Sequence, residues 1–423
     1  KIMKKLIIAV MSLLLVCSIA FANGAEESTS SGPVTVTFWN GYTGSDRPVL
    51  EDLVNQFNES QDEVYIDMLI MPWDTLYQRL MTSFIAGDGP DLIGFNIDRF
   101  AEYASAGRLL DLTSYIESSD VISADVMAPA LYNAGKYNGV QYAVPMSSTA
   151  VAMYYNKDHF RAAGLDPDNP PQTLEELFDA WDKLIVKDEN GNVTQYAQAI
   201  GVRSTVAMIP AFMWLYGADY IDENGDVVIN SPEAVECMTM LQEAFAKGVS
   251  PVGLTGQEAD NLFSAGVASI EWNGPWAYNG FVDAGIDVGV CELPSGVDGR
   301  KATIGGDSVL VINKDSKVAD AAWAFIEYWN SPDTQRQWSS GTGAPPTRMD
   351  MSDDEELLSA NPNIAVFLAA SENARIFMAG QTLASRFDTE ALVPLYESIA
   401  RGMETPEEAL ATAEATMNSI LGK

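Results

Sequence analysis

Apolar residues in the first quarter of the chain alternate between the spacing of strands and the spacing of helices. Residues 34–39, 63–72 and 91–95 are β-branched and apolar runs typical of strands. Residues 49–57 place apolar side chains at helical spacing, and residues 74–87 do the same before ending in glycine. This order of strand, helix, strand, helix, strand predicts an α/β fold with a parallel sheet covered by helices.

Polar and aromatic residues that follow the first and third predicted strands are candidate ligand contacts, because ligands bind at the carboxyl ends of strands in open parallel sheets. The candidates are Trp39, Asn40, Gly41, Tyr42, Asn96, Asp98 and Arg99. Trp39 has a second interpretation, in which its ring turns into the core. Asp98 is also placed to cap the helix that follows it, and this role is compatible with facing a ligand.

The remainder of the chain is richer in helical patterns. Residues 173–185, 231–248 and 317–332 predict amphipathic helices. Two Asp-Glu-Asn-Gly sequences, at 188–191 and 222–225, lack the alternating ligand positions and the final Glu of an EF-hand, so they predict turns and not calcium sites. We expect no metal.

Length and charge narrow the class of protein. A chain of 423 residues is too long for one typical core, so two domains are expected. Its net charge of -35 disfavours binding to nucleic acid or to anionic membrane surfaces and favours a neutral or cationic partner. The single histidine, His159, leaves little scope for a His-based metal site or catalytic triad.

The first residues have the pattern of an export signal. Two lysines, an apolar run and a small-residue exit predict a signal peptide at 1–22, followed by a flexible leader at 23–32. Lipidation at Cys17, which would anchor the exported protein to a membrane, is the second interpretation. Cys237 and Cys291 remain after cleavage, and either a disulfide or two unpaired core thiols fits them, with unpaired thiols favoured.

Sequence motifs for catalysis are missing. The chain has no GxSxG, HExxH, CxxC or GxxxxGK[ST] sequence, so we expect no enzyme activity and no cofactor. A secreted glycoside hydrolase stays open as an alternative, because its two carboxylates need no sequence motif.

Four stretches together resemble the extracellular solute-binding proteins of ABC sugar importers, the family of maltose-binding protein. They are residues 86–113 with GDGPD and DRF, 137–158, 263–278 with NGPWA, and 405–421. The resemblance implies a two-lobed periplasmic-binding-protein fold, in which each lobe is a mostly parallel sheet flanked by helices and a hinge joins the lobes. It also implies a sugar bound in the cleft and a membrane permease as partner.

The resemblance also assigns roles to single residues. Asp98 and Arg99 match a family DRF sequence whose Asp bonds sugar hydroxyls, and Trp276 matches a tryptophan that stacks on a sugar ring. Phe95 and Thr149 stand where maltose-binding protein has a tryptophan and a glutamate, which argues against maltodextrin as the ligand. Arg203 is a further candidate.

The stretch IEWNGPWAYNGF, residues 270–281, combines turn chemistry with large aromatic rings. A pyranose has apolar faces and a polar rim, so aromatic rings and polar side chains suit it together. We therefore expect Trp276 and Asn273 to contact ligand. For Trp272 a core role and a binding role are equally supported. Four other tryptophans at helical apolar spacing are expected in the core: Trp214, Trp323, Trp329 and Trp338.

The hinge is expected where the chain passes between lobes, near 147–150, 304–306 and 344–347. Ser148, Gly306 and Asp307 are candidate ligand contacts beside these crossings. The first lobe is predicted at 33–147 plus 306–345, and the second at 150–303 plus 347–423.

These patterns favour an exported, monomeric carbohydrate-binding protein, periplasmic or extracellular, that closes on a sugar and delivers it to an ABC transporter permease. Besides the hydrolase, the alternative is a binder of another neutral or cationic solute, such as a polyamine or glycerol phosphate. The identity, length and linkage of the sugar do not follow from the sequence.

Overall fold

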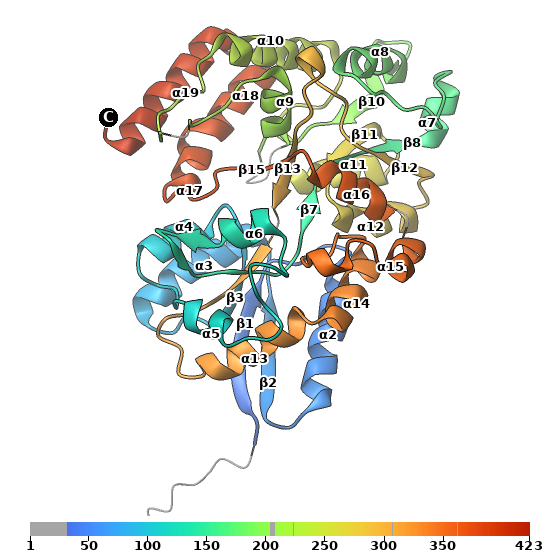
Figure 1. Ribbon diagram of the computed structural model, residues 1–423. Helices are drawn as coiled ribbons and strands as arrows, with labels where there is room; N and C mark the ends of the chain where they lie inside the picture. The colour runs from blue at the N-terminus through green and yellow to red at the C-terminus, as the bar shows by residue number, and fades with distance from the viewer. Residues whose placement is uncertain (1–31, 204–207, 223, 307, 362) are drawn as a thin grey trace, which may run out of the picture.

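The chain folds into two α/β lobes with a cleft between them (Figure 1). The computed structural model describes residues 32–203, 208–222, 224–306, 308–361 and 363–423. Each lobe contains a five-stranded sheet with helices packed on it. The predicted two-lobed α/β fold is therefore confirmed.

The first lobe is built from the N-terminal part of the chain and from a segment that returns after the hinge. Its sheet has the strand order β2-β1-β3-β14-β6. Its elements are β1 (Val34–Asn40), α2 (Arg47–Ser60), β2 (Val64–Ile70), α3 (Trp73–Ala86), β3 (Leu92–Asn96), α4 (Phe100–Ser105), α5 (Thr113–Glu117), α6 (Pro129–Ala134), β4 (Lys136–Tyr137), β5 (Val140–Gln141), β6 (Val144–Pro145), β14 (Ser308–Ile312), α13 (Ala319–Trp329) and α14 (Pro332–Thr342).

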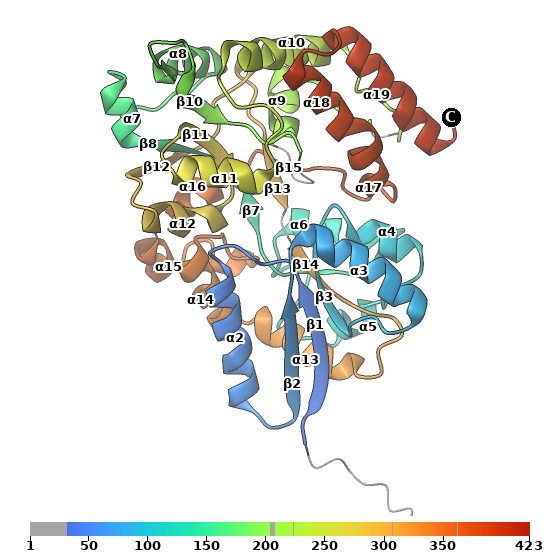
Figure 2. The same ribbon diagram turned by 180° about the vertical axis from the view of Figure 1, so that it is seen from behind.

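The second lobe carries the C-terminal helices, which lie on the outside of the molecule (Figure 2). Its sheet has the order β12-β8-β11-β10-β9. Its elements are β8 (Ala152–Asn156), α7 (Lys157–Ala162), α8 (Leu174–Leu184), β9 (Val186–Lys187), β10 (Val193–Ala199), α9 (Ile209–Tyr216), α10 (Pro232–Lys247), α11 (Gly256–Ser264), β11 (Ala268–Asn273), η1 (Pro275–Ala277), α12 (Tyr278–Asp283), β12 (Val288–Cys291), η2 (Val297–Gly299), α16 (Asn363–Ser371), α17 (Ala384–Phe387), η4 (Asp388–Leu392), α18 (Val393–Arg401) and α19 (Pro406–Leu421).

The N-terminal elements form as their local sequence predicts. Helix α3 buries Leu76, Leu80 and Phe84 on one face and ends at Gly87, which adopts the left-handed conformation and donates its N–H to the carbonyl of Ser83. Strand β1 pairs in parallel with both β2 and β3. The predicted alternation of strands and helices in this lobe is confirmed.

The first-lobe sheet is mostly parallel, as predicted, with β14 alone running in the opposite direction, but the second-lobe sheet differs from the prediction. In the second lobe only β10 and β11 are parallel, whereas β8 runs antiparallel to β11 and β12, and β9 antiparallel to β10. The physical reason is the hinge. Strands β8 and β14 each enter their lobe from the cleft, where the parallel strands end, and so they run in the opposite direction.

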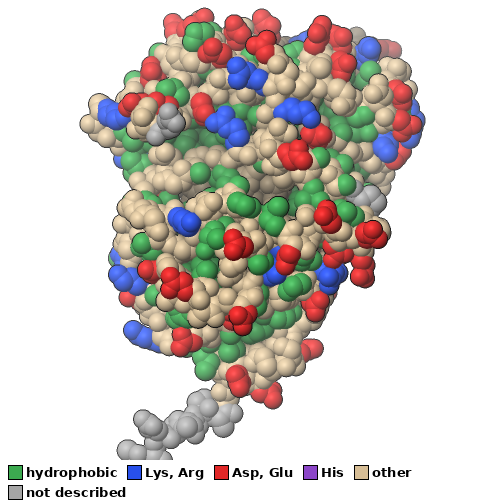
Figure 3. All heavy atoms as spheres, viewed as in Figure 1, with side chains coloured by type: hydrophobic (Ala, Val, Ile, Leu, Met, Phe, Trp, Pro, Cys, Tyr) green, Lys and Arg blue, Asp and Glu red, His purple; other side chains and the backbone are tan. Residues whose placement is uncertain are grey.

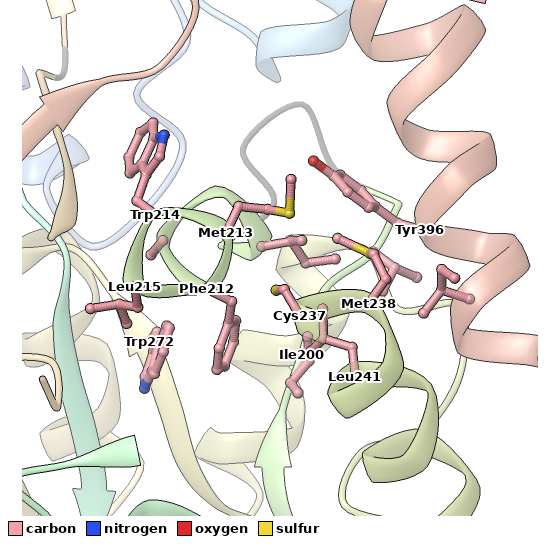
Figure 4. Close-up of a cluster of buried hydrophobic side chains, with 14 of the residues drawn as sticks. Ile200, Phe212, Met213, Trp214, Leu215, Cys237, Met238, Leu241, Trp272 and Tyr396 are labelled. Atoms are coloured by element: carbon pink, nitrogen blue, oxygen red, sulfur yellow. The ribbon is translucent and has the colours of Figure 1, made fainter. Parts of the chain in front are cut away.

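Each lobe has its own hydrophobic core. In the first lobe the fully or almost fully buried rings include Trp329 and Trp338, as predicted. In the second lobe α9 and α10 pack with α18, and Figure 4 shows Phe212 and Met213 of α9 close to Cys237 of α10. Cys237 and Cys291 are both free thiols. Trp214 and Trp323 are also buried, which confirms their predicted core positions.

A three-stranded sheet of β15 (Ala374–Ile376), β13 (Thr303–Gly306) and β7 (Thr149–Ala150) lies between the lobes, and the chain crosses from lobe to lobe at β7 and β13. The third connection, through η3 (Met349–Met351) and α15 (Glu355–Ala360), lies beyond the predicted crossing at 344–347. Thr347 accepts a hydrogen bond from the N–H of Ala128, and buried Arg348 donates to the carbonyls of Val121 and Asn330. These bonds hold residues 347 and 348 in the first lobe.

Candidate functional site

A cavity of about 300 Å³ lies between the lobes, where both sheets end. The surface is hollowed between the lobes in Figure 3. The predicted residues that line the cavity are Gly41, Tyr42, Asn96, Asp98, Thr149, Trp272, Asn273 and Trp276. Strand ends from both lobes therefore meet at one site, as the sequence pattern of the first lobe predicts for that lobe.

Two indoles, one from each lobe, reach the cavity over a glycine. The ring of Trp73 lies so close to Gly41 that an added Cβ would be 2.0 Å from it, and the ring of Trp276 lies 2.1 Å from the same point on Gly274. Glycine is therefore required at both positions for the rings to lie against the backbone. The carbonyl of Trp276 accepts a hydrogen bond from Ser45 of the opposite lobe.

Trp73 was not among the predicted site residues. It is the first residue of α3 and follows the end of β2, so its position beside the carboxyl edge of the sheet was the available signal. Tyr42 packs edge-on against it, with ring centroids 5.7 Å apart, and donates or accepts a hydrogen bond with Ser308. The first lobe thus provides an aromatic wall of its own.

Trp272 combines the two roles that the sequence left open. It is only 2% exposed and stacks on Phe212 at a centroid distance of 3.9 Å, as a core residue does (Figure 4). It also lines the cavity, and its Nε1–H has no hydrogen-bond partner in the part of the chain that the structure describes. Its indole forms a floor between the core and the site.

Two carboxyl groups line the cavity from the second lobe: Glu271 of β11 is buried, and Asp260 of α11 is half-buried. The amide of Asn273 joins them, because its Nδ2 donates to Asp260 Oδ1 at 2.8 Å and to Glu271 Oε1 at 3.2 Å. Burial raises the pKa of Glu271 well above its ordinary value, and the neighbouring Asp260 raises it further. Among the described residues, Glu271 Oε2 has no hydrogen-bond partner.

Sequence reasoning missed this acidic pair. Glu271 lies in a strand whose residues are all buried, and a carboxylate in such a strand is expensive unless it has a partner or a function. That was the available signal for Glu271. The sequence has no comparable signal for Asp260, because only the packing of α11 on β11 brings it to the cavity.

Asp98 and Arg99 point in different directions. Asp98 lines the cavity, and burial raises its pKa although the Arg99 guanidinium opposes the shift. Arg99 is 4% exposed and does not line the cavity. Its Nη2 instead lies 3.0 Å from Asp388 Oδ2 in the second lobe. The structure therefore places Arg99 between the lobes.

Three further candidates lie in or beside the core. Phe95 is fully buried, with its ring 4.7 Å from that of Tyr103, because it faces α3 and α4 and not the cleft. Trp39 turns to the same side and lies under the Arg79 guanidinium at 4.7 Å. Asn40 is fully buried, and its Oδ1 accepts the N–H of Tyr42 at 3.2 Å, so it shapes the loop that reaches the cavity.

The remaining candidates are placed as follows. Ser148 is buried beside the hinge and does not line the cavity. Arg203 is exposed and pairs with Glu397 at 3.2 Å. Gly306 has a positive φ of 116°, and an added Cβ would lie 2.8 Å from Ile97, so it is a hinge glycine and not a lining residue. Asp307 lies outside the described residues.

Acids, amides and aromatic rings dominate the chemistry of the cavity. Its acidic lining residues are Asp46, Asp98, Asp260 and Glu271. No Lys, Arg or His is among the lining residues within the described chain. The described residues also contain no group of three or more His, Cys, Asp or Glu suited to a metal ion. Such a cavity suits a ligand with hydroxyl groups and apolar faces, or one with a positive charge.

The described residues contain no helix that is both long and apolar enough to cross a membrane. Together, two lobes, a hinge and an enclosed cavity define a protein of the solute-binding class. Residues 43–336 match the family of bacterial extracellular solute-binding proteins, and the chain belongs to this family.

Relatives are known across most of the chain. It is 28% identical to a maltotriose-binding protein from Pyrococcus abyssi, over 78% of this chain and 70% of that protein. It is 24% identical to the sn-glycerol-3-phosphate-binding periplasmic protein UgpB of Escherichia coli O6:K15:H31, over 92% of each. The solved structure of maltose-bound MalE3 from T. maritima superposes with a TM-score of 0.80 at 25% identity, over 92% of this chain and 100% of that one. The named relatives and structural neighbours are binding proteins.

Proposed function

We propose that this protein captures a sugar or an oligosaccharide outside the cytoplasmic membrane and delivers it to the permease of an ABC transporter. The observation that carries the proposal is the cavity, in which Trp73 and Trp276 face the site from opposite lobes beside Asp98 and the Asp260–Glu271 pair. Indoles cover the apolar faces of a pyranose, and carboxylates accept hydrogen bonds from its hydroxyls. Family membership supports the role in transport.

The same residues argue against a phosphate ligand. A doubly charged phosphate is normally held by arginine, lysine or a helix N-terminus. The start of α11 lines the cavity at Gly256, but the described lining residues include four carboxyl groups, which repel a phosphate, and no basic side chain. The similarity to a glycerol-phosphate-binding relative therefore indicates a shared fold and not a shared ligand. The cavity favours a ligand without negative charge.

A hydrolytic role has less support than a binding role. The two carboxyl groups of a glycosidase lie about 5 to 10 Å apart, on either side of the scissile bond. Asp260 and Glu271 lie on one wall, where the Asn273 Nδ2 donates to both of them. They are on the same side of the site and not on either side of a scissile bond, so we infer that they bind and do not cleave.

Export is part of the proposal. Residues 1–22 have the sequence of a signal peptide, and a soluble binding protein reaches its permease only from outside the membrane. We expect cleavage after Ala22, with lipidation at Cys17 as the alternative. Mass spectrometry of the protein purified after export separates these outcomes, because a lipidated chain would begin at Cys17.

A thermal-shift screen tests the ligand class. The panel holds mono- and oligosaccharides, sn-glycerol 3-phosphate and the polyamine spermidine. A ligand at 100 times its Kd stabilises the folded protein by about 2.7 kcal/mol, so a saccharide ligand should raise the Tm clearly. Spermidine as the only stabiliser would contradict the proposal, and reducing-sugar release from a bound oligosaccharide would favour the hydrolase.

A further inference from the structure

Arg99 lies between carboxyl groups that belong to different lobes. Its Nε is 3.3 Å from Asp98 Oδ2 in the first lobe, and its Nη2 is 3.0 Å from Asp388 Oδ2 in the second. The side chains of Arg99 and Asp388 are 5% and 8% exposed. Opposite charges in so dry a contact attract each other more strongly than they would at the surface.

A second contact runs beside the first. Arg99 Nη1 donates to Ser385 Oγ at 2.8 Å, and the carboxylate of Glu102 accepts from the N–H of Ser385 at 2.9 Å and from its Oγ–H at 3.0 Å. Arg99 and Glu102 belong to the start of α4, and Ser385 to α17. Helix α17 lies above α4 in both views (Figure 1 and Figure 2).

The guanidinium therefore has partners on both sides of the cleft. Removing it would leave Asp98 and Asp388 near each other without the cation, with Glu102 close to Asp98. Removing one partner of a buried ion pair is costly because the remaining charge stays buried and uncompensated. At a pH where the carboxylates stay ionised, the lobes avoid that cost by moving apart and exposing the carboxylates to water.

We propose that Arg99 is a positioning residue for closure: its guanidinium holds the second lobe to the first through Asp388 and Ser385, and it orients Asp98 toward the cavity at the same time. A ligand bound at Asp98 thus contacts the carboxylate that is paired with this guanidinium. This role goes beyond the proposed sugar transport, and no sugar is needed to test it.

The opposite flank of the cleft offers a reporter of closure. A Cβ built on Gly280 of the second lobe lies 3.8 Å from the Cβ of Ser45 in the first. This separation is the mean Cβ–Cβ distance of a disulfide. A Ser45→Cys/Gly280→Cys pair should therefore oxidise only when the lobes are closed, and its rate reports the closed population even when that population is small.

The experiment measures the rate of disulfide formation in the full chain, with Cys17→Ser in every variant. Cys237 is buried and burial raises the pKa of its thiol, as it raises the pKa of the Cys291 thiol, so both react slowly. We expect Arg99→Gln to slow oxidation about tenfold, because the lobes repel each other when the cation is lost. An unchanged rate would overturn the proposal.

A matched control exists within one lobe. Arg161 bridges Asp158 at 2.7 Å and Asp287 at 2.9 Å, and all three belong to the second lobe. Arg161→Gln removes a guanidinium from between two carboxylates without affecting the cleft, so the oxidation rate should not change. An equal slowing in both variants would show that the loss is general and would overturn the specific role of Arg99.

Two further variants keep the test decisive if Arg99→Gln folds poorly. Asp388→Asn added to Arg99→Gln removes the opposing charge, so the rate should recover in part. Arg99→Lys retains the charge but not the fork of donors, so its rate should be intermediate. Circular dichroism on each variant shows that it is folded. A double variant as slow as Arg99→Gln, or an Arg99→Lys variant at the wild-type rate, would contradict the proposal.

Discussion

The two walls of the cavity hold their buried acids in different ways. On the first-lobe wall, Asp98 has a cationic neighbour, because Arg99 lies 3.3 Å away. On the second-lobe wall, Glu271 has another carboxyl group and an amide as partners, and no cation among the described residues that line the cavity. Burial raises the pKa of the acid on both walls, but on the first wall the Arg99 guanidinium opposes the shift, whereas on the second the neighbouring Asp260 adds to it.

The two acids differ in whether the protein itself provides their partners. Asp98 sits in a chain of charges that continues to the second lobe through Asp388. Glu271 is buried, which is unfavourable for a carboxylate, and its Oε2 atom has no hydrogen-bond partner among the described residues. A buried polar group that the fold leaves unsatisfied is a candidate for satisfaction by a ligand. We therefore infer that a bound ligand completes the hydrogen bonding of the second wall more than that of the first.

The largest expected effect comes from comparing an indole that lines the cavity, in the second lobe, with an indole in the core of the first lobe. Trp276→Ala should weaken saccharide binding by about 2 to 4 kcal/mol, or roughly 30- to 1000-fold, since it removes a stacking ring from the site. Trp338→Ala should instead lower the free energy of unfolding by about 3 to 5 kcal/mol, because that ring is buried in the first-lobe core.

Calorimetry and urea unfolding on both variants check this prediction. Affinity should fall in the first variant and stability in the second. Near-normal affinity together with a large loss of stability in Trp276→Ala would move that indole into the core. It would also remove the main support for a sugar-stacking wall.

The next prediction compares the glycines under the two indoles. Gly41→Ala and Gly274→Ala each place a methyl group about 2 Å from an indole, so each ring must shift. Overpacking of this kind costs about 1 to 3 kcal/mol. Because Trp73 and Trp276 line the same cavity, we expect both variants to lose saccharide affinity, measured by calorimetry. Gly32→Ala, with nothing near its added Cβ and no positive φ, is the control for binding.

Much of the first lobe was predictable because its determinants are local. The spacing of Leu76, Leu80 and Phe84 and the stop at Gly87 depend only on neighbours in the sequence. The site is different. Strand β3 is buried on both faces, so its pattern does not show that Phe95 faces the helices and not the cleft. Asp260 reaches the cavity only through tertiary packing, which no short pattern encodes.

Neutralising one acid on each wall should have opposite effects on stability. Asp98→Asn removes a carboxylate whose burial is unfavourable, but it also takes from the buried Arg99 one of its two anionic partners. We expect the second effect to be larger, so the free energy of unfolding should fall by about 1 to 2 kcal/mol. Glu271→Gln removes a carboxyl group that burial and Asp260 both disfavour, so stability should rise by about 1 kcal/mol. Urea unfolding at neutral pH measures both changes. Changes of the same sign would show that the two walls hold their acids in the same way.

The smallest effect concerns pH. Burial raises the pKa of Asp388 to about 6, even though Arg99 lowers it. The folded state therefore holds this proton more tightly than the unfolded chain, whose Asp pKa is about 3.9, and the contribution of Asp388 to stability decreases as pH rises between these values. We expect the wild type to lose on the order of 1 kcal/mol more than Asp388→Asn between pH 4 and pH 6.5. Asp98, Glu102, Asp74 and Tyr77 lie close by and are present in both proteins, so the difference between the two unfolding curves reports on Asp388. Parallel curves would show that Arg99 compensates the burial of Asp388 fully, which would make the interlobe contact stronger than its desolvation suggests.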